Sequence, residues 1–380
     1  MFNMSKYSDW QKQTWNRNFH ILHNLIKNEQ INKVIAVDFL PFNFKRAIKT
    51  YIQDQIIKDI RGSIIYGDLT SRCWQISSKI MVYSTIDSLI NPQKITKELN
   101  IIVKEQDMGE NLIVWNYNPL YIDYFNKLKQ KLNIFDTVDN WLEHSSYKNK
   151  IKILDKNYQK ILADSDIIFT VSKSLKENLF HNKDQVHWIP NAVDLEYFQS
   201  QTETHPLLRN IAKPIIGFLG ILQDRINNEI IEYLAKKNPQ YSIVLAGPVW
   251  KSFPKNHLEK YPNIYFTGPV SGQDIPKLYN EFSLGIIPYK TNKFIKSTDS
   301  MKFYEYLAKG LPIVSTPIQG IERFQKFIQV ASTPEQFNQQ VNQAIQNRKS
   351  INQSEVNDFL SQHTWQNRIE KMLNLINQKI

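Results

Sequence analysis

The stretch STDSMKFYEYLAKG, residues 297–310, gathers side chains that could bind a phosphorylated ligand. Thr298 and Ser300 place hydroxyl groups directly before a helical pattern, and Lys302 falls in its first turn. The start of a helix has unpaired N–H groups and a partial positive charge, so it favours phosphate. A cation there opposes the helix dipole, and a bound diphosphate would remove that conflict.

Glu305 lies three residues after Lys302, so the two side chains are neighbours on a helix. Its carboxylate could accept hydrogen bonds from a pair of vicinal hydroxyls, such as those of a ribose. An exposed Lys–Glu pair on a capped surface helix explains the same spacing. The helix itself is predicted over 300–309, because Gly310 suits its C-terminal end and Pro312 prevents its continuation.

Strand-like runs alternate with helical patterns along both halves of the chain, and such a scaffold would position these side chains. The runs are short, apolar and β-branched, and they lie at 34–40, 79–84, 111–117, 133–139, 166–172, 214–220, 241–247, 263–268, 284–289 and 312–317. Alternation of this kind is typical of a parallel sheet covered by helices. The sequence therefore predicts an α/β protein with two doubly wound domains.

A polar segment without periodicity at 199–213 is the predicted linker between these domains. The first domain would then comprise residues 1–198, and the second would comprise residues 214–363. A terminal helix is predicted over 364–380.

Glycines stand at the ends of three successive strand-like runs of the second half, at Gly220, Gly247 and Gly268. Ligands bind beyond the carboxyl ends of strands in open parallel sheets, and glycine lets the backbone approach them. One such glycine would be an ordinary turn residue, but three favour a ligand crevice. No GxGxxG follows a strand, so the dinucleotide fingerprint is absent from the sequence.

The composition narrows the classes of protein that the chain could represent. The single cysteine, Cys73, excludes a disulfide within the chain and argues against a cysteine metal site, and the eight histidines form no HExxH motif. We expect no metal site, no secretory signal and no membrane span, and a cytoplasmic location. The net charge of +11 is diffuse and lacks a nucleic-acid signature. It suits anionic substrates or an anionic membrane surface, and ordinary surface lysines explain it equally well.

Several segments resemble the GT-B glycosyltransferases, two-domain enzymes that use nucleotide diphosphate sugars. They are IPNAVDLEYF (189–198), IIGFLGIL (215–222), NIYFTGPV (263–270), TDSMKFYEYLAKGLPIVSTPI (298–318) and HTWQNRIEKML (363–373). The likeness is to the group-1 type of bacterial polysaccharide biosynthesis, especially teichuronic-acid transferases, and the chain is also similar to the xanthan glucuronosyltransferase. The resemblance implies two Rossmann-like domains that face a cleft, an acceptor domain first and a donor domain second. It also implies that the C-terminal helix packs back on the N-terminal domain.

The resemblance carries roles onto the residues that match the motifs. Glu305 would hold the donor ribose, Met301 and Lys302 would meet the diphosphate, and Ser300 would cap the helix at the phosphates. Tyr289 would line the nucleotide pocket, and the backbone of Pro269 and Val270 would meet the base. Two departures stand out, since many relatives have a glutamate where this chain has Ser297 and a basic pair where it offers only Arg225.

Asp136 and Asp139 lie at a strand end in FDTVDNWLEH (135–144), where inverting GT-B enzymes place a carboxylate that deprotonates the acceptor. Asp139 matches that carboxylate best and is our catalytic candidate, and we interpret Asp136 as structural. Either aspartate could instead cap the following helix. A retaining enzyme would need no such base.

The favoured function is transfer of a sugar from a nucleotide diphosphate sugar, a UDP-sugar, to a glycan or lipid-linked acceptor. We expect no metal and no cofactor beyond the donor itself, no nucleic-acid partner, and a peripheral position at the inner face of the membrane. Two other hypotheses stay open. One is a non-hydrolysing UDP-sugar epimerase, which shares the two-domain plan, and the other is a non-catalytic nucleotide-sugar-binding protein.

Overall fold

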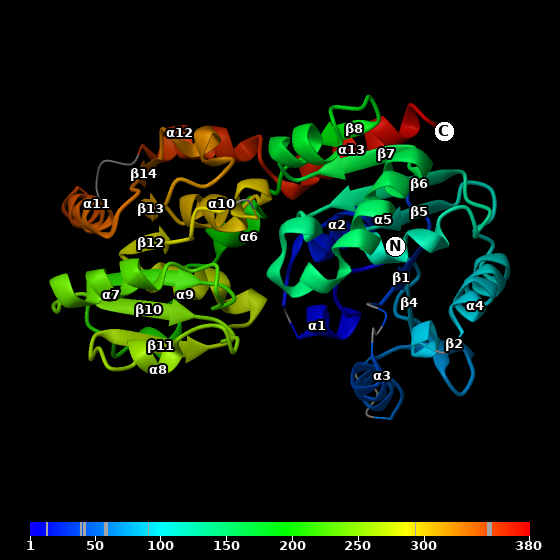
Figure 1. The fold of residues 1–380 in the computed structure, drawn as a ribbon, viewed down its shortest axis with the longest axis horizontal. Coiled ribbons are helices and arrows are strands. Elements are labelled where there is room, and N and C mark those ends of the chain that lie inside the picture. The colour runs from blue at the N-terminus through cyan, green and yellow to red at the C-terminus, as the bar shows by residue number, and fades with distance from the viewer. Residues whose placement is uncertain are drawn as a thin grey trace. The chain divides into compact units, whose positions relative to one another are not determined.

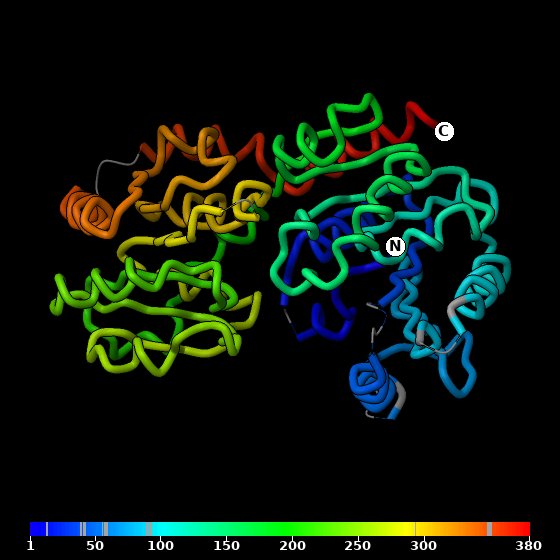
Figure 2. Tube along the Cα trace, viewed as in Figure 1, coloured from blue at the N-terminus to red at the C-terminus, as the bar shows by residue number. Residues whose placement is uncertain are grey.

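The computed structural model describes residues 1–12, 14–38, 40, 43–56, 60–89, 91–292, 294–347 and 352–380. The chain forms two compact units. The first contains residues 1–171, 175–189 and 369–380, and the second contains residues 172–174 and 190–368. Figures 1 and 2 trace the chain through both units.

The first unit contains two groups of strands. One has the order β1-β4-β3-β2, and the other has the order β5-β6-β7-β8. The strands are β1 (Val34–Val37), β2 (Ser63–Gly67), β3 (Ser71–Gln75), β4 (Ile80–Thr85), β5 (Ile113–Asn116), β6 (Leu132–Thr137), β7 (Ile167–Thr170) and β8 (Val186–Trp188). The second group is parallel throughout, whereas β2 and β3 form an antiparallel hairpin that the alternating pattern did not predict. The prediction of a parallel core holds, with this hairpin added at one edge.

Phe2 joins the two groups of strands. It forms parallel bridges to Val37 at the end of β1 and to Asn116 at the end of β5. The Phe2 N–H donates to the carbonyl of Trp115 at 2.8 Å, and the buried Phe2 ring stacks on Tyr124. A single short segment therefore satisfies the inner edges of both groups.

The helices of the first unit are α1 (Tyr7–Gln11), α2 (Arg17–Leu25), α3 (Phe44–Tyr51), α4 (Pro92–Glu105), α5 (Ile151–Asp164) and most of α13 (Trp365–Asn377). The part of α13 after residue 368 belongs to this unit and contacts α2. Its buried side chains include Met372 and Ile376, and Asn377 hydrogen-bonds Gln30. The prediction that the C-terminal helix packs back on the N-terminal domain is confirmed.

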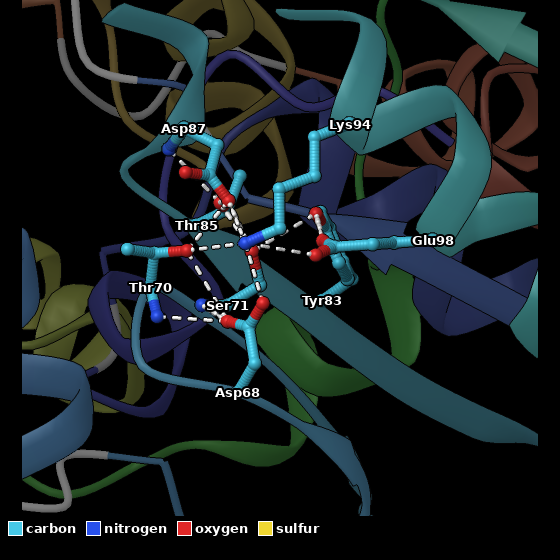
Figure 3. A network of polar contacts seen from close by, with 8 residues as sticks. All are labelled: Asp68, Thr70, Ser71, Tyr83, Thr85, Asp87, Lys94 and Glu98. Carbon is cyan, nitrogen blue, oxygen red and sulfur yellow. Dashed lines mark hydrogen bonds and ion pairs between the residues drawn. The ribbon is translucent and has the colours of Figure 1, made fainter. Parts of the chain in front are cut away.

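A network of acidic side chains surrounds Lys94 on α4, next to the β2–β3 hairpin (Figure 3). The Lys94 ammonium lies 2.9 Å from an Asp87 oxygen and 3.3 Å from a Glu98 oxygen, and it also pairs with Asp68. Among the described residues, Asp68, Asp87 and Glu98 are the one set of acidic, histidine or cysteine side chains close enough together to hold a metal ion. Because an ammonium already contacts all three, we interpret the cluster as a lysine-centred structural network.

The second unit contains one parallel sheet of six strands, in the order β11-β10-β9-β12-β13-β14. They are β9 (Ile215–Leu219), β10 (Ser242–Ala246), β11 (Ile264–Gly268), β12 (Leu284–Ile287), β13 (Ile313–Ser315) and β14 (Ile328–Val330). In chain order this is 3-2-1-4-5-6, the arrangement of a Rossmann-like domain. Its core is built from the buried aliphatic residues of these strands, which read as near-continuous apolar runs because helices cover both faces.

The helices of the second unit are α6 (Leu195–Ser200), α7 (Asn228–Lys237), α8 (Lys255–Leu258), α9 (Ile275–Glu281), α10 (Met301–Ala308), α11 (Pro334–Gln346) and α12 (Gln353–Ser361). The segment 199–213, which we predict as the linker, clusters with this unit. Lys309 donates to the carbonyls of Phe198 and Gln201, and Asn280 donates to that of Glu203. These contacts come from residues far along the chain, so the polar composition of the segment does not reveal them.

No helix among the described residues is long and apolar enough to cross a bilayer.

Candidate functional site

The strand order of the second sheet reverses between β9 and β12, which are direct neighbours. In open α/β sheets, ligands bind beyond the carboxyl ends of the strands at such a point. Gly220 follows β9, and Tyr289 lies two residues after β12. Two backbone hydrogen bonds, from Lys290 to the Arg225 carbonyl and from Asn227 to that of Pro288, tie the two loops together.

Gly220 and Gly247 are required by close packing at these strand ends. Both have positive φ, +149° at Gly220 and +128° at Gly247, a region that disfavours side chains. A Cβ at Gly247 would lie 2.1 Å from the Gly220 carbonyl oxygen, and one at Gly220 would lie 2.9 Å from the Lys302 ammonium. Glycine is therefore needed at each position for a specific reason. At Gly247 the neighbouring backbone of Gly220 leaves no room for a side chain, and at Gly220 a side chain would crowd against Lys302.

Helix α10 starts where the sequence predicts, with Ser300 as N-cap, and it ends before Gly310, whose φ is +64°. The Ser300 side chain makes no capping bond, and its hydroxyl is buried without a hydrogen-bond partner among the described residues. The Thr298 hydroxyl donates to the carbonyl of Ile295 at 2.9 Å. A buried hydroxyl without a partner is costly, so a ligand atom at the start of α10 would stabilise Ser300.

Lys302 points toward aromatic rings and a hydroxyl. Its ammonium donates to the Tyr289 hydroxyl at 3.1 Å and lies 5.2 Å from the centre of the Phe218 ring. The Arg225 guanidinium lies 5.0 Å from the centre of the Tyr289 ring. Burial by itself raises the pKa of Tyr289, but the two cations reverse this and lower it. Positive charge thus accumulates at this end of the sheet.

Glu305 is half-buried one turn after Lys302 and accepts a hydrogen bond of 2.9 Å from the Tyr279 hydroxyl. Burial raises the pKa of Glu305, although Lys302 and the bond from Tyr279 act in the opposite direction. The predicted Lys–Glu neighbours are thus not a surface ion pair, because Lys302 bonds Tyr289 and Glu305 bonds Tyr279. One oxygen of Glu305 is left for a further donor.

A polar cluster that the sequence reading missed fixes the loop before α10. Asp299 accepts from the Asn191 backbone N–H at 2.7 Å and pairs with Arg323 at 2.5 Å, and Arg323 also donates to Tyr304. From the sequence, Asp299 is one of several possible N-caps before the helix. Its partners Asn191 and Arg323 lie 108 positions before it and 24 positions after it, so no local pattern could have identified them.

The remaining predicted residues of the second unit make no side-chain polar contact with Lys302 or Glu305 among the described residues. Met301 is the half-buried first residue of α10. Pro269 is exposed and Val270 packs on the core, both directly after β11, which is two strands away from β9. Ser297 is buried, and its hydroxyl donates to the Phe294 carbonyl at 2.7 Å. The serine that replaces the glutamate of many relatives thus turns inward.

In the first unit, Asp136 and Asp139 differ in their surroundings. Asp136 is the penultimate residue of β6 and is fully buried. It pairs with Arg17 of α2, whose Nε lies 3.1 Å from Oδ1 and 3.2 Å from Oδ2. Burial raises its pKa, and Arg17 opposes that rise. Asp139 is half-buried in the following loop, and its carbonyl lies 3.5 Å from the Tyr158 hydroxyl. The buried ion pair with Arg17 is consistent with the interpretation of Asp136 as structural, and Asp139 follows three residues later in a loop.

The chain is similar to known proteins in both sequence and structure. A family model described as "Glycosyl transferase-like" matches residues 225–374. TuaH of Bacillus subtilis, which is assigned to teichuronic acid biosynthesis as a glycosyltransferase, is 22% identical over 265 residues. That match covers 66% of this chain and 67% of TuaH.

Two solved structures share the fold over nearly the whole chain. HepE of Anabaena, in complex with UDP and glucose, superposes with a TM-score of 0.64 at 12% identity and covers 94% of this chain and 95% of its own. Sucrose-phosphate synthase of Thermosynechococcus elongatus gives 0.66 at 11% identity, with coverage of 93% and 92%. The chain therefore has the GT-B fold, most of its second unit matches the glycosyl transferase-like family model, and it is distantly similar to TuaH.

Proposed function

We propose that this chain transfers a sugar from a UDP-sugar to a glycan or lipid-linked acceptor in the assembly of a cell-surface polysaccharide. The observation that carries the proposal is the start of α10. There the buried Ser300 hydroxyl has no hydrogen-bond partner among the described residues. The Lys302 ammonium, in the first turn of the same helix, adjoins Gly220 at the carboxyl end of β9. HepE, which shares the fold, is described in complex with UDP and with UDP-glucose.

The diphosphate of the donor would bind at the start of α10. Backbone N–H groups, the hydroxyls of Thr298 and Ser300, and the Lys302 ammonium would contact its oxygens, beside Met301. This arrangement supplies positive charge from the protein itself, so the proposal requires no metal ion. Because such donors are fixed before the reaction, they stabilise the charge that develops on the leaving UDP.

The nucleoside would extend from the diphosphate along the same edge of the sheet. Glu305 would accept hydrogen bonds from the ribose hydroxyls through the oxygen that Tyr279 leaves available. Tyr289 would line the pocket, and the backbone of Pro269 and Val270 would meet the base. The second unit is accordingly the proposed donor domain, and the first unit is the proposed acceptor domain.

The reaction forms a bond between an acceptor hydroxyl oxygen and the anomeric carbon, and it breaks the bond from that carbon to UDP. If configuration inverts, the hydroxyl proton passes to a general base, for which we propose Asp139. Its loop follows Asp136, which Arg17 holds in place. If configuration is retained, a donor phosphate oxygen takes the proton and Asp139 has no such role.

A turnover assay tests the function. The protein is incubated with UDP-sugars, with and without lipid and glycan extracts as acceptors, and released UDP is measured. Release that depends on an acceptor is the expected result. Epimerisation of the donor without any acceptor would instead identify a UDP-sugar epimerase. Tight UDP binding without turnover under every condition would identify a non-catalytic binding protein.

The product's anomeric configuration tests Asp139. A β product from an α donor, determined by NMR, would agree with a base, and Asp139→Asn should then lower kcat by about a hundredfold to ten-thousandfold. Asp123→Asn is the matched control, because Asp123 is an exposed carboxylate of the same unit. An α product, or an unchanged kcat in Asp139→Asn, would remove Asp139 from the mechanism.

A further inference from the structure

Helix α3 and the π-helical segment η1 (Ile52–Ile56) that continues it carry their apolar side chains on the outside. Phe44, Ile48, Ile52 and Ile56 recur every four residues, with 68%, 58%, 40% and 61% of their surface exposed. We call these four residues the α3 stripe. Such a spacing places them along one side of a helix. In a helix that packs on its own domain, this is the side expected to be buried.

The inward side of the same segment is small and polar. Ala47, Thr50 and Asp54 are buried. Asp54 accepts from the Lys6 ammonium at 2.5 Å and from the Ser84 hydroxyl at 2.7 Å. The segment is thus held to the first unit by polar contacts, and its orientation leaves the α3 stripe exposed. Figure 1 shows α3 at the lower edge of that unit. Exposed apolar side chains in a continuous line indicate a surface that binds a partner.

Basic residues flank the α3 stripe. Lys45, Arg46 and Lys49 are exposed, whereas Asp54, the one acidic residue between positions 44 and 56, is buried against Lys6. The outer face of the segment therefore combines apolar area with three positive charges. A second copy of the chain on this face would bring like charges together, which disfavours a dimer. An anionic surface with an apolar interior complements both features.

More positive charge lies next to α3. A cavity of about 1100 Å³ opens in the first unit, with an apolar lining that includes Leu40, Tyr121 and Tyr124. Its lysines are Lys97, Lys104, Lys127 and Lys150, against one carboxylate, Asp123. The Tyr121 hydroxyl donates to the Leu40 carbonyl at 2.9 Å, and Arg46 of α3 is close enough to Tyr121 to influence its pKa. Arg46 thus acts electrostatically on one residue of this lysine-rich lining.

We propose that residues 44–56 bind the surface of an anionic lipid bilayer, with the α3 stripe among the acyl chains and the flanking cations at the head groups. Segments that combine a strong apolar side with basic residues lie in the membrane interface in this way. The proposal goes beyond sugar transfer, because it identifies the element that would hold the first unit at a membrane.

Co-sedimentation with vesicles tests the proposal. The full chain should bind vesicles of equal parts phosphatidylglycerol and phosphatidylcholine about tenfold or more tightly than phosphatidylcholine alone. The variant Phe44→Gln/Ile48→Gln/Ile56→Gln should lose about tenfold or more of that binding. Leu69→Gln is the matched control, because Leu69 is a lone apolar residue of the same unit and is 85% exposed.

A charge variant keeps the test decisive if the triple variant folds poorly. Lys45→Gln/Lys49→Gln leaves the apolar side intact and should weaken binding to the anionic vesicles about tenfold, and high salt should weaken wild-type binding as well. Unchanged UDP affinity in both variants separates this result from the donor site. Three outcomes would overturn the proposal: no binding of the wild type at low salt, equal binding by the triple variant, or a wild-type dimer that the triple variant abolishes and vesicles do not displace.

Discussion

Two partly buried lysines, one in each unit, have opposite surroundings. The Lys94 ammonium contacts Asp68, Asp87 and Glu98, so acidic side chains more than match its charge. The Lys302 ammonium contacts a tyrosine hydroxyl and aromatic rings, and none of the ion pairs between described residues includes it. Carboxylates therefore contact Lys94 directly, whereas among the described residues Lys302 has only the more distant influence of Glu305.

This difference separates a structural cation from one that awaits a ligand. Removing a cation that carboxylates surround leaves buried negative charge behind, so the cost falls on stability. Removing a cation with no anionic partner costs the fold little, so the cost falls on binding of an anion. Variants of both residues, measured for both stability and binding, therefore test the comparison.

The largest expected effect is that of Lys94→Met on the stability of the first unit. Asp87 and Glu98 are buried and would lose their ammonium, so the free energy of unfolding should fall by roughly 3 kcal/mol. Urea denaturation followed by tryptophan fluorescence measures it, with UDP affinity unchanged where the second unit stays folded. Lys97→Met, an exposed lysine of the same helix, is the control. A loss as small as that of the control would refute the structural role of Lys94.

Lys302→Ala should weaken UDP binding by about tenfold to a hundredfold, because a hydrogen bond to a charged group contributes roughly 1.5–3 kcal/mol. Its urea midpoint should match the wild type. Isothermal titration calorimetry with UDP measures the affinity, and Lys296→Ala, an exposed lysine just before α10, provides the control. Wild-type affinity in Lys302→Ala would exclude a diphosphate at this position.

Glu305→Ala should weaken UDP binding by about fivefold to tenfold. The effect is smaller than that of Lys302→Ala because Glu305 would accept hydrogen bonds from uncharged ribose hydroxyls, whereas Lys302 would contact a charged phosphate. The ligand distinguishes it from the previous variant. Competition with uridine, which has a ribose but no phosphate, should show a loss for Glu305→Ala and none for Lys302→Ala. Equal losses of uridine affinity in the two variants would mean that the ribose and diphosphate positions are assigned wrongly.

The smallest effect concerns pH and the Lys94 network. Burial alone raises the pKa of Asp68, but the bond to Lys94 and the N–H donors of Thr70 and Ser71 lower it to about 2. A carboxyl with a lowered pKa stabilises the fold above its ordinary pKa, and this contribution is lost as pH falls toward about 2. Asp68 is one-third exposed, so the gain should stay below about 1 kcal/mol.

Comparison of Asp68→Asn with the wild type measures that contribution. The wild type should be the more stable protein at pH 5, and the difference in the free energy of unfolding should shrink as pH falls from 4 toward 2. A difference that stays constant over this range would show that Asp68 contributes through packing rather than through its charge.

Local signals made the start and end of α10 predictable. Hydroxyl-bearing residues before the helix, Gly310 after it and Pro312 beyond act within a few positions of the chain. The structure agrees with the predicted bounds, although the Ser300 side chain makes no capping bond. Most of the parallel strands were predictable for the same reason, because buried parallel strands leave continuous apolar runs. The two strands of only three residues that end their sheets, β8 and β14, were not among the predicted runs. The donor-site assignments themselves stay predictions that the variants above test.

Contacts between distant residues were not predictable. The sequence suggested Lys302 beside Glu305, but the fold places Lys302 against Tyr289 and Glu305 against Tyr279. The hairpin of β2 and β3 was not predicted, because the residues of β2 do not alternate between buried and exposed. All of Ser63–Gly67 are partly or fully exposed. Helix α3, whose apolar side faces outward, is also not predictable from local sequence. Periodicity predicts that a helix has an apolar side, but not which way that side faces.

The division of the chain has a consequence for the order in which the units can be completed during synthesis. The second unit takes nearly all of its residues from one continuous stretch, 190–368. The first unit begins earlier but needs residues 369–380, whose Ile369, Met372, Leu373 and Ile376 are buried. During synthesis the first unit therefore begins to fold before the second and is completed after it. The surface of the first unit that α13 covers stays exposed until the final turns of α13 have emerged.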